Sequence, residues 1–526
     1  MAAPDDAKPE DARPRNAADA GPALLRGWLA AAARAFPEKP YLVSVEDGRT
    51  LSYAALAQTA ARIAGHLAAR KIGANRRVAL LANNSLEHVA VYVGVLAAGA
   101  AICTIHVEMN RSHLDGVLPA LAPALVLHEE GLGLEALAAQ TACAWRPLGR
   151  WENNGGEGFF ADLAADTPQP QGASGSDRDD AVICFTSGTT ALPKGVVLTY
   201  RELLPNATAI AGAFGLGADD RLYDYRSFNW ASAQILSALG TLSVGATLLL
   251  GRKFSRSRFF ADIARLEATV ATGNPTVLNM LMHGEDAVRG ADLPHLRFIT
   301  SSSAPLLVEE WRRFEQRFGI PVAQGYGSSE TGWIAGCTDR TKRYGSVGKP
   351  LPYLRAAVVG RDGRRLRAGE IGHVEIGAYD DCAFRHIGED GGLHVNAVGR
   401  MRTGDMGFLD GDGYLHLTGR EKDLIIRGGV NISPLEIDAV LMQLADIAEA
   451  AAVGAPHPIY GEEVVASVVL RPGSALTADD ILAHCAAYLP PFKAPKRIAI
   501  AAALPKTERG KLDRKAVAVQ WRTFHK

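Results

Sequence analysis

Apolar positions along the first half of the chain follow two spacings that alternate. Residues 54–70 carry apolar side chains three and four positions apart, which predicts an amphipathic helix that closes near Gly73. Residues 77–81 form a short apolar run that predicts a strand. The alternation returns with helices expected at 201–214 and 233–244 and extended segments at 222–223 and 247–250. Strands and helices that alternate in this way predict a layered α/β domain with a largely parallel sheet.

Residues 89–105 are uncharged over seventeen positions, which approaches the length of a membrane span. Gly94, Gly99 and the following Ile-Cys-Thr instead predict a buried helix and then a strand. Asn84 and Glu87 have the spacing of a capping box at the start of this helix. We therefore expect no membrane span here.

The pattern changes near residue 345. Residues 345–417 are rich in glycine and short apolar runs, with a hairpin turn at 410–413, and predict a small β subdomain. Beyond Arg420, capped helices expected at 433 and 477 flank a strand at 464–470. The predicted fold class is α/β: a large N-terminal layered α/β domain at 21–419 that includes the β subdomain, and a small α+β C-terminal domain at 420–526.

Composition narrows the classes of function. A chain of 526 residues exceeds the roughly 250–300 residues of a single core, so at least two domains are expected. The net charge of −1 gives no overall attraction to nucleic acid. Six scattered cysteines without a C-x-x-C pair argue against zinc and disulfides and favour a reducing, cytoplasmic location. Residues 1–20 lack the apolar core of a signal peptide and predict a disordered tail.

The most informative stretch is T-S-G-T-T-A-L-P-K-G at residues 186–195, an irregular loop between two apolar runs. Glycine allows backbone N–H groups to approach anionic oxygens, hydroxyls donate further bonds, and Lys194 adds a mobile charge, so the loop suits a polyphosphate. The spacing of an ordinary P-loop does not fit. For the loop taken alone, a surface turn rich in Ser, Thr and Gly is the alternative.

Four more segments follow in a fixed order. They are S-S-S-A-P-L at 301–306, Q-G-Y-G-S-S-E-T at 324–331, R-T-G-D at 402–405 with G-R at 419–420, and L-P-K-T-E-R-G-K at 504–511. With the loop at 186–195, this series resembles the acyl-adenylate-forming superfamily, which includes acyl-CoA synthetases, peptide-synthetase adenylation domains and luciferase. The resemblance covers about residues 24–518. One departure is Ala191, where the family usually has glycine.

The resemblance implies the roles of individual residues. Those that bind ATP or AMP would be Thr186, Ser187, Gly188, Thr189, Thr190, Lys194, Ser303, Ala304, Gly325, Tyr326, Gly327, Ser329, Asp405 and Arg420. Lys511, Glu330 and Lys194 would be catalytic, and Glu330 would also hold Mg²⁺. Tyr326 would flank adenine and Asp405 would accept both ribose hydroxyls. Taken singly, each motif has a plain structural alternative, such as a turn, a solvated carboxylate or a basic tail.

The resemblance also assigns residues to the acyl pocket and to the small C-terminal domain. Phe228, Asn229, Trp230 and Ser302 would line the acyl pocket, although these residues would equally suit core packing. Gly428 and Gly429 would line the CoA tunnel, and glycines would also suit a plain turn there. Lys422 would be the hinge about which the C-terminal domain moves.

The resemblance implies an ATP-dependent carboxylic acid–CoA ligase that uses ATP, Mg²⁺ and CoA and takes a small carboxylic acid. No nucleic-acid partner or membrane span is expected, and the sequence allows a homodimer without deciding the oligomeric state. One alternative is a stand-alone adenylating enzyme that loads a carrier protein. The absence of an attached carrier domain and the F-K-A-P-K-R pattern at 492–497 favour CoA. A more distant alternative, to which only Ala191 points, is an inactive nucleotide-binding or scaffold protein.

Overall fold

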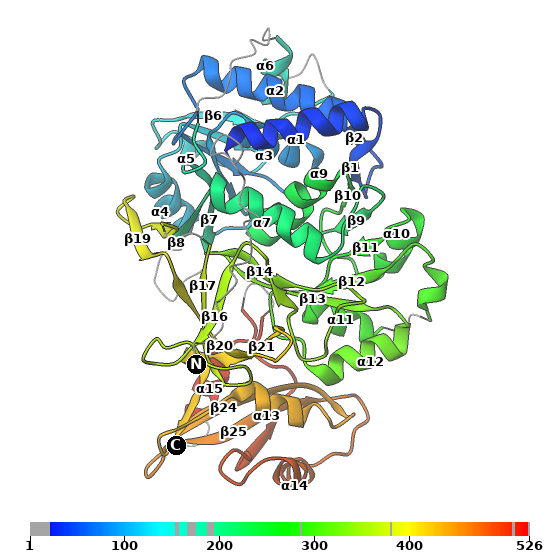
Figure 1. Cartoon of the computed structure of the whole chain (residues 1–526), viewed down its shortest axis with the longest axis vertical. Helices are drawn as coiled ribbons and strands as arrows, with labels where there is room; N and C mark the ends of the chain where they lie inside the picture. Colours follow the sequence, from blue (N-terminus) through cyan, green and yellow to red (C-terminus); the bar gives the residue numbers. More distant parts are fainter. Residues whose placement is uncertain are drawn as a thin grey trace, which may run out of the picture.

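The computed structural model describes residues 21–152, 157–165, 175–186, 194–284, 287–378, 381–507 and 511–523. The expected N-terminal tail, residues 1–20, lies outside the described residues. These described segments form four sheets. Figure 1 shows the N-terminal elements at one end of an elongated molecule and the C-terminal elements at the other. The prediction of a large N-terminal α/β domain and a smaller C-terminal domain is confirmed.

An eight-stranded sheet has the order β19-β18-β8-β7-β4-β3-β5-β6. Its strands are β3 (Arg77–Leu81), β4 (Ala101–Ile105), β5 (Leu125–His128), β6 (Ala144–Pro147), β7 (Asp180–Thr186), β8 (Lys194–Thr199), β18 (Ala383–Ile387) and β19 (Leu393–Val398). Strands β7, β4, β3, β5 and β6 pair in parallel. Helices α3 (Leu86–Ala97) and α4 (Arg111–Leu121) make the crossovers that a parallel sheet requires. Every residue of α3 is buried, so the apolar run at 89–105 forms a core helix and then a strand, as predicted.

A nine-stranded sheet has the order β15-β14-β13-β12-β11-β9-β10-β1-β2. Its strands are β1 (Pro40–Ser44), β2 (Thr50–Ser52), β9 (Arg221–Asp224), β10 (Thr247–Leu250), β11 (Val270–Ala271), β12 (Phe298–Ser301), β13 (Val322–Ser328), β14 (Gly332–Gly336) and β15 (Lys349–Pro350). Strands β1, β10, β9, β11, β12 and β13 are parallel. Their carboxyl ends therefore meet at one edge, the usual location of ligands in an open α/β sheet.

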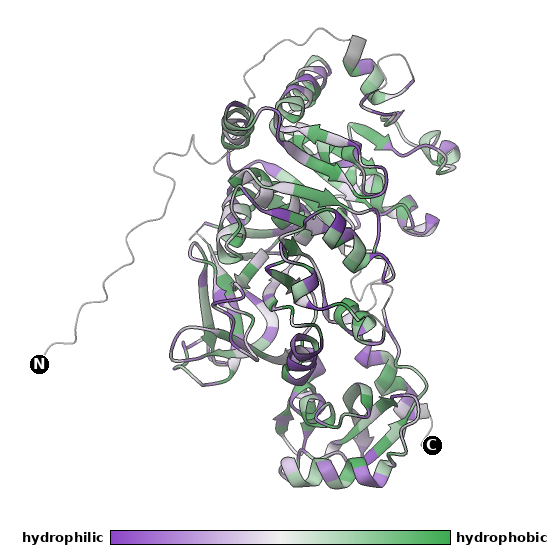
Figure 2. Ribbon diagram, turned by 90° about the vertical axis from the view of Figure 1, so that its right-hand side faces the viewer, coloured by the Kyte–Doolittle hydropathy of each residue, from purple (hydrophilic) through white to green (hydrophobic). Residues whose placement is uncertain are grey.

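Helices cover and join these two sheets. They are α1 (Pro22–Ala35), α2 (Tyr53–Ala69), α5 (Glu135–Ala138), α6 (Phe159–Ala165), α7 (Tyr200–Ala213), α8 (Ala231–Ala233), the π-helix η2 (Gln234–Gly240), α9 (Thr241–Val244), α10 (Phe259–Arg265), α11 (Pro275–Met282), the 3₁₀ turn η3 (Gly290–Asp292) and α12 (Val308–Phe318). The largest core cluster contains residues from α1, α2, α3 and α7 together with strands of both sheets. Figure 2 shows hydrophobic residues concentrated on the interior strands.

The glycine-rich region forms an antiparallel sheet of β16 (Arg355–Val359), β17 (Gly372–Gly377), β20 (Met401–Leu409) and β21 (Leu415–Arg420). The predicted hairpin turn at 410–413 joins β20 to β21. One part of the prediction is wrong, because β18 and β19 leave this region and join the eight-stranded sheet. Backbone pairing between β18 and β8, almost two hundred positions away in the chain, overrides proximity in sequence.

The C-terminal sheet contains β22 (Ile425–Arg427), β23 (Val430–Ile432), β24 (Ile447–His457), β25 (Gly461–Leu470) and β26 (Arg497–Ile500). Helices α13 (Pro434–Leu441), α14 (Ala478–Tyr488) and α15 (Arg514–Thr523) pack with it, and the 3₁₀ turn η4 (Glu421–Asp423) connects it to β21. This unit contacts the large domain through α12, where Arg313 donates to the carbonyl of Met442 at 2.8 Å.

Several local expectations are corrected. Ser85, rather than Asn84, caps α3 by accepting from the backbone N–H of His88. Ser433 precedes Pro434 at N1 of α13 as expected, but its hydroxyl donates to the carbonyl of Thr418 and makes no cap bond.

Thr477 and Asp480 do form the predicted capping box of α14. No helix in the described residues combines the length and apolar character that crossing a membrane requires.

Candidate active site

Three residues from two of the motifs meet where the nine-stranded sheet faces the β subdomain. Tyr326 on β13 donates its hydroxyl to the Asp405 carboxylate on β20 at 2.5 Å. Arg420 lies opposite Asp405 on β21, and its Nε is 3.2 Å from the second carboxylate oxygen. Burial and the neighbouring Asp405 charge raise the pKa of Tyr326, so the phenol stays protonated and remains a donor. The structure thus brings together three of the predicted nucleotide-binding residues.

The serine motif lies at the end of the adjacent strand β12. Ser301 pairs with Gln324 in register, so this motif and the Gly325–Tyr326–Gly327 segment occupy neighbouring strand ends. Ser303 is exposed and has a φ of 72°, a left-handed conformation that costs a non-glycine residue energy. Ala304 follows it in the same turn. Ser302 is buried, with no hydrogen-bond partner for its hydroxyl in the described residues.

Packing explains the two glycines of this segment. A Cβ at Gly325 would lie 2.6 Å from the Trp333 ring, and one at Gly327 would lie 2.4 Å from the carbonyl of Gly332. Both contacts are closer than real Cβ atoms tolerate. These glycines are therefore required by the approach of β14, whatever their role toward a nucleotide.

The phosphate-loop candidates are only partly described. Thr186 ends β7 and pairs with Lys194, the first residue of β8, so a strand–loop–strand hairpin forms as predicted. Ser187, Gly188, Thr189, Thr190 and Ala191 lie outside the described residues. Lys194 is exposed, and its charge is close enough to His386 on β18 to help burial lower the pKa of that histidine.

Glu330 occupies the half-buried turn between β13 and β14, next to Ser329. No group of three or more His, Cys, Asp or Glu side chains that could hold a metal occurs among the described residues. A lone carboxylate fits Mg²⁺ only where nucleotide phosphates supply most of the remaining oxygen ligands. The donor set therefore suits a metal that arrives with ATP.

Three of the acyl-pocket candidates lie on the loop that follows β9, and the fourth, Ser302, follows β12. Phe228 is fully buried and belongs to the largest core cluster, Asn229 is buried, and Trp230 is half-buried at the start of α8. Gln234 holds this loop by donating to the Phe228 carbonyl at 2.6 Å.

Asn84 holds the same loop from the other side. Its amide donates to the Arg226 carbonyl at 2.8 Å, and its amide oxygen accepts from the Phe228 N–H at 2.9 Å. The capping-box interpretation thus assigned Asn84 to the wrong partner.

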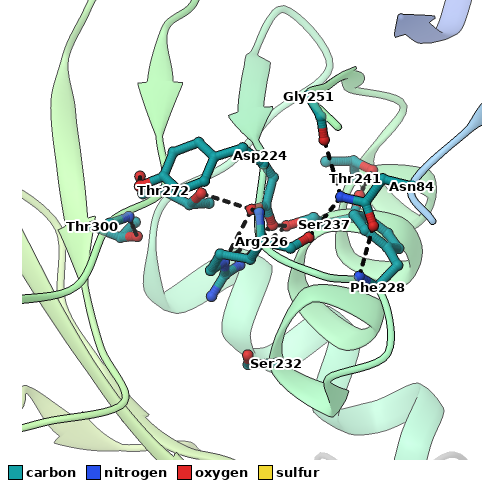
Figure 3. A network of polar contacts seen from close by, with 12 residues as sticks. Asn84, Asp224, Arg226, Phe228, Ser232, Ser237, Thr241, Gly251, Thr272 and Thr300 are labelled. Atoms are coloured by element: carbon teal, nitrogen blue, oxygen red, sulfur yellow. Dashed lines mark hydrogen bonds and ion pairs between the residues drawn. The ribbon is translucent and has the colours of Figure 1, made fainter. Parts of the chain in front are cut away.

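Sequence reasoning missed a buried polar network beneath this loop (Figure 3). Arg226 forms a two-pronged ion pair with Asp224, with Nη2 2.8 Å from Oδ2 and Nε 3.0 Å from Oδ1. Ser237 and Thr272 donate hydroxyls to the same carboxylate at 2.5 and 2.8 Å. The available signal was the pair of opposite charges two positions apart at the end of an apolar strand.

The remaining candidates lie on the C-terminal sheet and its connection. Gly428 and Gly429, with φ of 56° and 82°, form the two-residue turn between β22 and β23, a conformation that demands glycine. Lys422 is exposed in η4. Lys511 is exposed beside α15, and its N–H and carbonyl both bond to Thr507. These residues thus belong to the C-terminal unit and its connection to β21, whereas Tyr326 and Asp405 belong to the large domain.

Comparison with known proteins agrees with this arrangement. Residues 29–379 match the family described as AMP-binding enzyme, and residues 436–511 match the AMP-binding enzyme C-terminal domain. The chain is 32% identical to the sulfoacetate–CoA ligase of Cupriavidus necator, over 93% of this chain and 96% of that protein. It is 30% identical to the oxalate–CoA ligase of Arabidopsis thaliana, over 94% and 98%.

A solved structure shares the fold. The crystal structure of ATP-bound MatB from Rhodopseudomonas palustris has a TM-score of 0.81 and 27% identity, and the match covers 95% of this chain and all of that one. Both family domains are present, in the order that the motifs predicted. The chain therefore belongs to the AMP-binding enzyme family, within the acyl-CoA synthetase branch of the acyl-adenylate-forming superfamily, and is an AMP-forming acid–thiol ligase.

Proposed function

We propose that the enzyme joins a carboxylic acid to CoA in two half-reactions at one site. The acid carboxylate attacks the α-phosphate of ATP, which gives acyl-AMP and pyrophosphate, and the CoA thiol then displaces AMP to give acyl-CoA. The main support for a nucleotide site here is the contact of Tyr326 and Arg420 with Asp405, near the strained Ser303. A carboxylate held in this way can accept two ribose hydroxyls, while the phenol ring flanks the base.

The roles of the other residues complete the proposal. Lys511 neutralises the charge that develops on the α-phosphate, and Lys194 with the loop at 186–193 holds the phosphates. Glu330 would bind Mg²⁺, and the metal would neutralise part of the phosphate charge. Phe228, Asn229, Trp230 and Ser302 surround the acyl group, and Gly428 and Gly429 line the path of CoA.

Lys511 and the turn at Gly428–Gly429 lie in the same small C-terminal domain but serve successive half-reactions, so we infer that this domain changes its orientation between them. Lys422 in η4 would be the pivot, and the domain boundary would fall between 419 and 420. Arg313 joins the two units by a hydrogen bond from a side chain to the Met442 carbonyl, a contact that can break and form again without disturbing either core. We also propose a cytoplasmic location, supported by six cysteines that form no disulfide.

Pyrophosphate release over a panel of carboxylic acids, with and without CoA, tests the proposal. We expect acid-dependent pyrophosphate release and consumption of free CoA thiol. Pyrophosphate release without thiol consumption would instead favour a carrier protein as acceptor. If no acid supports release, the protein is an inactive nucleotide binder.

A further inference from the structure

The ion pair of Asp224 and Arg226 lies at the carboxyl end of β9, and β11 and β12 separate this strand from β13, which carries Tyr326. Asp224 is 0% exposed and Arg226 is 4% exposed. A buried ion pair loses so much hydration that it adds little to stability, and apolar residues of similar size would serve the core as well. The pair therefore calls for a role beyond packing.

Two of the three guanidinium nitrogens of Arg226 form hydrogen bonds within the described residues, and the third does not. Its Nε and Nη2 donate to Asp224, and Nη2 also reaches the Ser237 hydroxyl at 3.3 Å. Its Nη1, which carries two N–H groups, has no hydrogen-bond partner anywhere in the described part of the chain. Buried polar groups are almost always bonded, so this exception points to a partner beyond the described residues, such as a bound ligand.

The orientation of that nitrogen is fixed. Asp224 holds one edge of the guanidinium and is itself saturated, because it also accepts from the Arg226 N–H, Ser237 and Thr272. Neutral dipoles thus stabilise the Asp224 charge, and the carboxylate orients the guanidinium. In Figure 3 one Arg226 nitrogen, which no dashed line reaches, points away from Asp224 toward the side where Ser232 and Thr300 lie.

Other unpartnered polar atoms lie at the carboxyl ends of β9 and β12 or just after them. The amide oxygen of Asn229 and the hydroxyls of Ser301 and Ser302 are buried without a partner in the described residues. Ser301 ends β12, and only β11 separates this strand from β9. Within the described residues, the amide of Asn229 bonds to the Ser227 hydroxyl, which can accept or donate, so a flipped amide would present its N–H₂ instead.

We propose that Arg226 is a specificity-determining residue that binds a second anionic group, a carboxylate or a sulfonate, on the acid substrate. This inference rests on the proposed acyl-activating function. The two N–H groups of Nη1 form charge-assisted bonds to such a group, which are stronger than bonds between neutral groups. A purely aliphatic acid would leave those buried donors without hydrogen bonds. Because unpaired buried donors cost free energy, the enzyme discriminates against such an acid.

The first test uses the wild-type enzyme with oxalate, malonate, succinate and sulfoacetate, against propionate and malonamate. Malonamate matches malonate in size but replaces the second carboxylate by a neutral amide. We expect kcat/KM for the best dianionic acid to exceed that for either monoanionic acid by at least about tenfold. Equal or better use of propionate or malonamate would overturn the proposal, and the diacid and sulfoacetate arms identify the anionic group.

The second test changes the arginine. In Arg226→Lys the single ammonium is held by Asp224, so no donor points outward, and the ratio of dianion to monoanion kcat/KM should fall about tenfold. Arg221→Lys, at the other end of β9, is the matched control and should leave the ratio unchanged. Thermal unfolding checks that each variant folds.

A further variant covers the case in which Arg226→Lys fails to fold. The double variant Asp224→Asn with Arg226→Met removes both charges together and leaves no buried charge alone. An unchanged ratio in a folded variant would overturn the assignment. If the wild-type enzyme released no pyrophosphate with any acid, the proposed function itself would be refuted. Failure of the specificity proposal and failure of the proposed function are therefore distinguishable.

Discussion

Replacing Asp405 by Asn removes one charge at the centre of the proposed nucleotide contact and almost no volume. Asp405 accepts from Tyr326 and pairs with Arg420 in the structure, and a ribose diol would add two more O–H donors. The asparagine has one acceptor oxygen, and its N–H₂ group can accept neither from Arg420 nor from a ribose hydroxyl. Hydrogen bonds to a charged group contribute about 1.5–3 kcal/mol each, so losing one should weaken ATP binding roughly ten- to hundredfold.

Isothermal titration with ATP and the KM for ATP in acid-dependent pyrophosphate exchange measure this loss. The KM for the carboxylic acid should change little, because Asp405 is assigned to the nucleotide alone. Arg420 is largely exposed, so solvent screens its ion pair with Asp405 and the unfolding temperature should fall only slightly. Unchanged ATP affinity together with a large fall in unfolding temperature would refute the reasoning and leave Asp405 as a structural link between β13 and β20.

Asp410→Asn is the matched control at the far end of the same hairpin. Burial tends to raise the pKa of Asp410, but the N–H of Tyr414, His416 and Arg343 lower it below its ordinary value. A lowered folded-state pKa stabilises the fold above the ordinary aspartate pKa, and this contribution disappears as the pH falls through the folded-state pKa. The control should therefore reduce stability at neutral pH, show a weaker loss of stability on acidification, and keep wild-type ATP affinity.

Three further predictions concern the proposed half-reactions. Lys511→Ala should raise the activation free energy of acyl-AMP formation by about 3–4 kcal/mol, while thioester formation from supplied acyl-AMP survives; unchanged adenylation in single-turnover assays would exclude the assignment. Trp230→Ala should broaden use toward bulkier acids and raise the KM of the native acid with little effect on ATP; an equal loss for all acids would make Trp230 structural. Lys422→Pro fits a 3₁₀ turn and locks its φ, so acyl-AMP should form near normally while transfer to CoA slows; the opposite pattern would contradict the hinge.

Local patterns in the sequence were sufficient for much of the fold. The apolar run at 89–105 gave a buried helix and a strand, and the capping box at Thr477 opened its helix. Such features depend on neighbours within one or two turns of chain, so spacing alone predicts them. The order of five motifs likewise predicted the family and placed Tyr326, Asp405 and Arg420 in one expected site.

Other features depended on contacts between distant segments. Asn84 has the sequence position of a helix cap, but it bonds to Phe228, 144 positions away. The strands at 383–398 belong by proximity to the β subdomain, but they pair with β8. A side chain or strand edge takes the partner that packing brings closest, and that choice is invisible to spacing.

The buried pair of Asp224 and Arg226 shows the same division most clearly. Their identities and separation were present in the sequence, where opposite charges near the end of a strand usually suggest a solvated pair. Only the closure of β9, β11 and the π-helix around them removed both from water. Because desolvation makes an unused donor costly, the tertiary structure alone turned Arg226 Nη1 into a candidate for recognising the substrate.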